Sequence, residues 1–86
     1  MPRARFVIAV TLYSRPGCHL CDEMKAIVAR AIGGRADVAV EEVDISSDPA
    51  LEARYGLEIP VLLVDGRKVA KYRVDEGAVR RAIAQE

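Results

Sequence analysis

The stretch Thr11–Lys25 (TLYSRPGCHLCDEMK) carries the residue pair with the most informative chemistry, Cys18 and Cys21. They are the only cysteines of the 86-residue chain, and the only histidine, His19, lies between them. A pair with this spacing can belong to a metal site, a structural disulfide or a redox centre. The choice among these three largely determines what the protein does.

The number of available ligands argues against a zinc site. Structural zinc normally takes four Cys or His ligands from two separated pairs. Here Cys18, His19 and Cys21 crowd onto one turn, and the chain has no further Cys or His. A structural disulfide gains little, since closing a four-residue ring contributes only about 2 kcal/mol before strain is subtracted. We therefore predict neither a metal site nor a structural staple.

Redox chemistry fits the position of the pair. Arg15-Pro16-Gly17 interrupts an apolar run, which predicts that Cys18 begins a helix. Unpaired backbone N–H groups and the positive end of the helix dipole favour a thiolate there, and the thiolate is the nucleophilic form. Cys21, nearly one turn later on the same face, can attack a mixed disulfide at Cys18. We predict Cys18 as the nucleophile and Cys21 as the resolving thiol.

Other residues are candidates for substrate binding or tuning. If protonated, His19 stabilises the adjacent thiolate, but the preferred interpretation is a solvent-facing side chain that only tunes the reduction potential. Arg15 adds positive field near the site or is a solvated charge. Ile59 and Pro60 directly precede an apolar strand, where proline is tolerated. A cis Ile59–Pro60 bond would turn the Ile59 backbone toward the cysteines, where an extended substrate could pair with it.

The elements that must position these residues follow from hydrophobic patterning. Four strands are predicted, at 6–13, 38–45, 61–64 and 68–73. The first is apolar on both alternating sets, which is typical of a strand covered by helices on both faces. Asp48 and Asp75 are expected to cap the second and third helices, and Asp65-Gly66 to form a hairpin turn. The order β-α-β-α-β-β-α predicts one α/β domain over 1–86, a four-stranded mixed sheet flanked by three helices.

Composition excludes other classes of protein. The 13 basic and 13 acidic residues balance, whereas a nucleic-acid binder normally has a basic excess. No apolar run approaches the length of a membrane span, and the short run after Arg3 and Arg5 lacks a cleavage site. We predict a cytoplasmic protein with no nucleic-acid or membrane partner. The basic residues of the hairpin are expected to form a solvated face whose charge Asp65, Asp75 and Glu76 offset (Arg67, Lys68, Lys71, Arg73). The three tyrosines are expected to be packing residues (Tyr13, Tyr55, Tyr72).

The chain resembles the thioredoxin-fold superfamily, specifically the small glutaredoxin-like proteins. The resemblance rests on the first strand, RPGCHLC opening a helix, EEVDI, EIPVLLVDG and the closing helix. It implies a thioredoxin-like fold with Cys18 as nucleophile, Cys21 as resolving thiol and Pro60 as the family's cis-proline. Arg15 matches a basic position that contacts the glutathione carboxylate in glutaredoxins.

Four positions depart from the family patterns. The central pair of the glutaredoxin C-P-Y-C is His19-Leu20, and the Gly-Gly pair after the hairpin is Ala70-Lys71, whose side chains would crowd glutathione. The T-V-P segment is Glu58-Ile59-Pro60, which puts a carboxylate near an anionic ligand. Where thioredoxins have a buried acid, this chain has Leu12.

The functional prediction is a monomeric thiol–disulfide oxidoreductase without a resident cofactor. Its substrates would be protein disulfides or glutathione mixed disulfides, with a reductase or glutathione as the electron source. Two alternatives stay open. One is a peptide-binding module in which the cysteines are incidental. The other is a homodimer that carries an iron–sulfur cluster on Cys18 of each chain, with glutathione completing the ligands.

Overall fold

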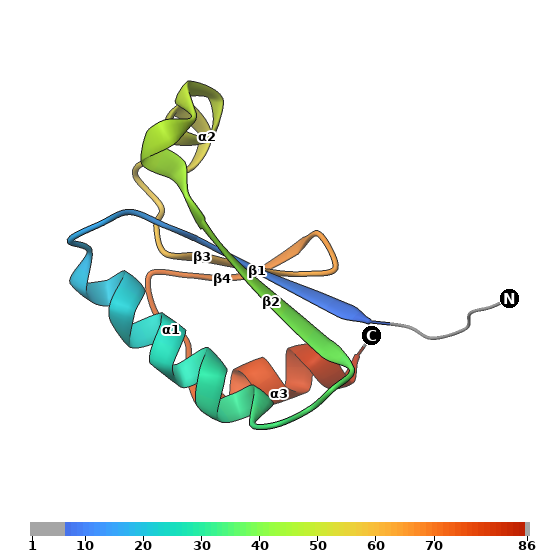
Figure 1. Cartoon of the computed structure of the whole chain (residues 1–86). Helices are drawn as coiled ribbons and strands as arrows, with labels where there is room; N and C mark the ends of the chain where they lie inside the picture. The colour runs from blue at the N-terminus through green and yellow to red at the C-terminus, as the bar shows by residue number, and fades with distance from the viewer. Residues whose placement is uncertain (1–6, 86) are drawn as a thin grey trace, which may run out of the picture.

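The structure, a computed structural model, describes residues 7–85 of the chain (Figure 1). In chain order the described elements are β1 (Ile8–Ser14), α1 (His19–Ile32), β2 (Val38–Asp44), the short 3-10 helix η1 (Ile45–Ser47), α2 (Pro49–Tyr55), β3 (Val61–Val64), β4 (Arg67–Lys71) and α3 (Glu76–Ala84). The predicted order β-α-β-α-β-β-α is therefore confirmed. None of the helices within the described residues is long and apolar enough to cross a membrane.

The strands form one mixed sheet in the order β2-β1-β3-β4. β1 runs parallel to β2 and antiparallel to β3, with Tyr13 opposite Val61. β3 and β4 form an antiparallel hairpin. Its turn residues Asp65 and Gly66 have φ values of +50° and +82°, as a two-residue type I′ turn requires. The carboxyl end of β1 and the amino end of β3 therefore lie at the same end of the sheet.

The helices cover the two faces of the sheet unequally. In Figure 1, α1 and α3 lie together along one face, while α2 stands near one end of the sheet. A main core of ten buried residues fills the space between the sheet and the α1–α3 layer (Val10, Leu12, Met24, Val28, Ile32, Leu62, Val64, Val79, Ala82, Ile83). A smaller cluster consists of four buried residues, one of which belongs to α2 (Ile45, Tyr55, Val61, Leu63).

The prediction that helices cover both faces of β1 is wrong for the first half of the strand. Val10 and Leu12, in the main core, are each 1% exposed, whereas Ala9 on the opposite face is exposed and Thr11 is only half-buried. α2 has just seven residues. It therefore covers Tyr13 at the end of β1 and leaves the start of the strand open.

Local signals set the helix starts. The Asp48 carboxylate accepts the backbone N–H groups of Ala50 and Leu51 at 2.9 and 3.3 Å. The Asp75 carboxylate accepts the N–H of Ala78 at 2.8 Å. Both predicted N-caps are thus confirmed.

Strand boundaries differ from the predictions at five ends. β1 ends at Ser14, one residue after the predicted end, and β4 begins at Arg67, one residue before the predicted start. The first strand was predicted from Phe6, which lies outside the described residues, and the described strand begins at Ile8. β2 ends one residue early because the Asp44 carboxylate caps η1. β4 ends at Lys71, two residues before the predicted end, because Tyr72 has φ +68° and cannot continue the strand.

The three tyrosines do not share one role. The Tyr13 and Tyr55 rings stack with centroids 4.6 Å apart, so the prediction of packing is confirmed for both. Tyr72 is 43% exposed. The prediction of a packing residue is therefore wrong for Tyr72, whose positive φ turns the chain away from the sheet.

Candidate active site

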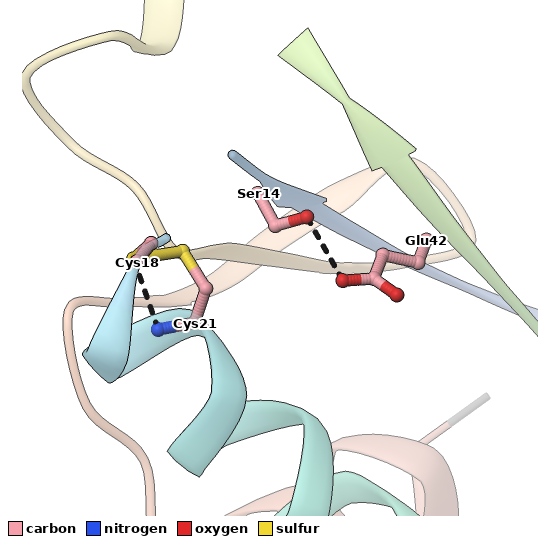
Figure 2. The surroundings of a disulfide bond; sticks show 4 residues. All are labelled: Ser14, Cys18, Cys21 and Glu42. Atoms are coloured by element: carbon pink, nitrogen blue, oxygen red, sulfur yellow. Dashed lines mark hydrogen bonds between the residues drawn. A yellow bond between two sulfur atoms is a disulfide. The ribbon is translucent and has the colours of Figure 1, made fainter. Parts of the chain in front are cut away.

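Cys18 is the N-cap residue of α1, at the end of the loop that follows β1 (Figure 2). Its backbone is extended, and its Sγ accepts the backbone N–H of Cys21 at 3.0 Å. Gly17, with φ +80°, lets the loop turn into the helix. A sulfur in this position faces the backbone N–H groups of the first helical turn and the positive end of the helix dipole, which favour a thiolate once the disulfide is reduced.

Cys21 lies in the first turn of α1 and is joined to Cys18 by a disulfide, with the two Cα atoms 5.2 Å apart. The two sulfur-bearing residues differ in access. Cys21 is 1% exposed, whereas Cys18 is half-buried. A thiol or disulfide arriving from solvent therefore meets Cys18 first.

Pro60 is fully buried at the start of β3, and the Ile59–Pro60 peptide bond is cis. Because Tyr13 pairs with Val61, Pro60 lies level with the end of β1, from which the loop to Cys18 leaves. The Ile59 N–H donates to the Tyr55 carbonyl at 3.1 Å. This donor is therefore used within the chain.

Arg15 precedes Cys18 by three residues and His19 follows it directly, but the two side chains have different surroundings. Arg15 forms an ion pair with Glu52 of α2, and both side chains are 38% exposed. The pair ties the loop before Cys18 to α2, and a ligand carboxylate at Arg15 would compete with Glu52. His19 is the first residue of α1 and is exposed.

A polar network beside the disulfide was not predicted from the sequence. Figure 2 shows Ser14 at the end of β1 and Glu42 of β2 next to the two cysteines. Ser14 is only 4% exposed, and its hydroxyl donates to Glu42 Oε2 at 3.0 Å. Lys25 of α1 pairs with the other carboxylate oxygen at 2.9 Å. The network links β1, β2 and α1 at the end of the sheet that carries Cys18.

Glu42 is held in its ionised form. The hydrogen bond from Lys25 is the main cause that lowers the pKa of Glu42, and the Ser14 hydroxyl adds to it against an opposing effect of burial. An open cleft of about 240 Å³ lies beside the network, with seven lining residues (Ser14, Arg15, Pro16, Gly17, Asp22, Glu42, Asp44). Within residues 7–85, no group of three or more His, Cys, Asp or Glu side chains could hold a metal ion.

One sequence signal could have found this network. Ser14 falls in phase with Val10 and Leu12, which predicts a buried polar residue, and a buried hydroxyl needs a partner. The partner could not be named, because Glu42 is brought beside it by the register of β1 and β2.

The fold and the site define the class of protein. A mixed four-stranded sheet, three helices and a Cys-x-x-Cys disulfide at the start of α1 are those of a thioredoxin-fold protein. The crystal structure of mitochondrial thioredoxin 3 from Saccharomyces cerevisiae has the same fold, with a TM-score of 0.67 at 17% identity. The match covers 95% of this chain and 81% of that chain.

The family follows from closer matches. The family model of the glutaredoxin-like domain matches residues 9–84, so the chain belongs to the glutaredoxin-like family. The X-ray structure of a structural-genomics target protein from X. campestris is 37% identical, with a TM-score of 0.76, and covers 90% of this chain and 97% of that chain. An uncharacterized protein of Mycobacterium tuberculosis is 34% identical over 82 residues, which are 88% of this chain and 82% of the relative.

Proposed function

We propose that the protein is a thiol–disulfide oxidoreductase in which Cys18 is the nucleophile and Cys21 the resolving thiol. The observation that carries this proposal is the unequal access to the two sulfurs of one disulfide. Cys18 is half-buried at a helix N-cap, and Cys21 is 1% exposed one turn later. Membership of the glutaredoxin-like family supports redox chemistry at this pair.

The reaction begins with the reduced dithiol. The Cys18 thiolate attacks one sulfur of a substrate disulfide, the substrate S–S bond breaks, and the departing thiolate takes a proton from water. Cys21 then loses its proton and attacks Cys18 Sγ, which releases the second substrate thiol. Two electrons have passed to the substrate, and the protein is left with the Cys18–Cys21 disulfide seen in the structure.

The residues around the pair have separate tasks in this cycle. The Cys21 N–H, 3.0 Å from Cys18 Sγ, stabilises negative charge on that sulfur both as the attacking thiolate and as the leaving group in re-reduction. The Ile59 carbonyl aligns a substrate segment beside Cys18. Arg15, fixed by Glu52, holds the loop before Cys18 in place.

Substrates and electron source follow from the same chemistry. We propose protein disulfides and glutathione mixed disulfides as substrates, and a dithiol reductase or two molecules of glutathione to return the electrons. This cycle needs a reducing compartment, which agrees with a cytoplasmic location. The residues Ala70 and Lys71 occupy the positions of the glutaredoxin Gly-Gly pair. Ala70 packs against the main core, and the Lys71 side chain is exposed.

Trapping the mixed disulfide tests the assigned roles. The reduced Cys21→Ser variant, incubated with oxidised glutathione, should form a stable adduct at Cys18, because nothing resolves it. The adduct is measured by intact mass and peptide mapping. The matched Cys18→Ser variant should form none, since Cys21 is buried. An adduct on Cys18→Ser but not on Cys21→Ser would contradict the roles.

A further inference from the structure

Two apolar side chains that the exchange reaction does not use are exposed beside the segment leading into Pro60. Leu57 is 92% exposed and Tyr72 is 43% exposed. The Tyr72 hydroxyl donates to the Leu57 carbonyl at 2.7 Å, and the Tyr72 N–H donates to the Pro60 carbonyl at 2.8 Å. We call these two residues the Leu57–Tyr72 ridge. Its hydrogen bonds place it against the same segment that lies level with the start of the Cys18 loop.

The backbone holds Tyr72 on the surface at a cost. Its φ is +68°, and the Arg73 N–H donates to the Lys71 carbonyl across it at 2.7 Å, which makes a three-residue γ-turn. Positive φ is unusual for a bulky aromatic residue. Strain of this kind persists where the surrounding structure enforces it, and it is concentrated at functional sites. Here its effect is to present an aromatic ring to solvent beside an exposed leucine.

Basic side chains lie next to Tyr72 and Glu58, near the ridge. Lys71 Nζ lies 5.5 Å from the centre of the Tyr72 ring. Lys68 pairs with Glu58 at 2.8 Å and is the main cause that lowers the pKa of Glu58, with Lys71 and Arg54 adding to it. Three cations therefore face one carboxylate, and positive charge is in excess.

The acids expected to balance the basic hairpin have other hydrogen-bond or ion-pair partners. Asp65 accepts the backbone N–H of Ala9 at 2.8 Å, and Asp75 accepts that of Ala78. Glu76 pairs with Arg30 and Arg80. The partners of these three acids are residues other than Lys68, Lys71 and Arg54, so the local excess of positive charge at Glu58 remains although the whole chain is neutral.

We propose that the Leu57–Tyr72 ridge and Lys71 form a docking surface for a disulfide-bearing protein partner that presents an apolar side chain and acidic residues near its reactive cysteine. The proposal rests on the proposed oxidoreductase function and names the class of its substrate. The apolar residue of the partner would cover Leu57 and Tyr72, and its carboxylates would face Lys71 and Arg54. Charge complementarity selects an acidic partner over a neutral or basic one.

Single-turnover oxidation of the reduced protein tests this proposal. Two peptide disulfides serve as substrates, identical except that two Glu residues, three and four positions from the cysteine, are replaced by Gln. Hydroxyethyl disulfide, which is too small to reach the ridge, is the third substrate. The second-order rate constant with the Glu peptide should exceed that with the Gln peptide about tenfold at low salt, and the ratio should fall with added salt.

Matched variants test which residues cause the preference for the Glu peptide and the fast reaction with both peptides. Lys71→Glu should abolish the preference for the Glu peptide, while Arg81→Glu, the same charge change on exposed Arg81 of α3, should preserve it. Leu57→Ser should slow both peptides about fivefold, since an exposed anchor is lost. Val40→Ser, at a residue 50% exposed on β2, should slow neither. Hydroxyethyl disulfide should react at the wild-type rate with all four variants.

The outcomes distinguish a failure of the proposed docking surface from a failure of the proposed oxidoreductase function. Equal rates with the Glu and Gln peptides, or equal effects of Lys71→Glu and Arg81→Glu, would overturn the acidic docking surface while leaving the oxidoreductase intact. A preference that Lys71→Glu removes, together with unchanged hydroxyethyl disulfide rates, would support it. If none of the three disulfides oxidises the reduced wild-type protein, the proposed oxidoreductase function itself is overturned.

Discussion

The two faces of the sheet differ in what they contribute. On one face, α1 and α3 enclose the main core of ten buried residues, and Cys21 belongs to the same helix α1. On the other, the seven-residue α2 is part of a cluster of four and leaves the start of β1 open. The first face supplies most of the buried apolar area, which is the principal source of stability.

This difference separates stability from recognition. The main core fixes α1 and so holds Cys21 out of solvent beneath Cys18. In the proposed function, the segments that meet a substrate belong to the α2 side, where Arg15 pairs with Glu52 and Ile59 hydrogen-bonds to Tyr55. We expect changes on the first face to affect folding most, and changes on the second to affect local order near the site.

Neighbouring leucines of β3 give the sharpest test of the comparison and the largest expected effect. Leu62 is 0% exposed in the main core, and Leu63, on the opposite face, is 9% exposed. Leu62→Ala should lower the free energy of unfolding by about 3 kcal/mol or more, because it leaves a cavity in an enclosed core. Leu63→Ala should cost less, about 2 kcal/mol, since the open face can relax. Urea denaturation of the oxidised proteins measures both, and an equal or reversed order would break the comparison.

Removing the N-cap of α2 should have a smaller, local effect. Asp48→Ala deletes the acceptor for the Ala50 and Leu51 N–H groups and should cost about 1 kcal/mol. Asp48→Asn keeps an acceptor and is the control. Amide hydrogen exchange should accelerate in α2 and remain unchanged in α1. Equal acceleration in both helices would show that the two sides unfold as one unit.

The smallest expected effect concerns Glu42 and depends on pH. Lys25 and Ser14 lower its pKa in the folded protein, so this carboxylate adds stability above its unfolded pKa and loses it as the pH falls through the folded value. Because the pair with Lys25 is partly exposed, Glu42→Gln should cost less than about 1 kcal/mol at neutral pH. The difference from wild type should shrink below about pH 4. A difference that grows in acid would contradict the assignment.

Local signals predicted much of the fold and the position of Cys18 at the start of a helix. The caps at Asp48 and Asp75, the Asp65-Gly66 turn and the start of a helix at Cys18 depend on residues a few positions apart, so the sequence alone reveals them. Their physical causes, unpaired N–H groups and positive φ, act within one turn of chain.

Long-range contacts account for what the sequence did not predict. Glu42 and Ser14 are 28 residues apart in sequence and meet through the register of β1 and β2. Lys25 joins them from helix α1. The open half of the second face depends on how far α2 extends over the sheet. Tyr72 was expected to pack because its neighbours are apolar, yet its backbone is set by a hydrogen bond to Pro60.

The central claim, a two-electron dithiol–disulfide cycle at Cys18 and Cys21, is tested most directly by redox equilibration. The purified protein is equilibrated in glutathione buffers of graded ratio, its thiols are alkylated, and intact mass is measured. We predict one transition in which two alkylation sites appear or disappear together, and which is absent from Cys18→Ser. Two alkylatable thiols at every ratio, even with a stronger oxidant, would contradict the cycle.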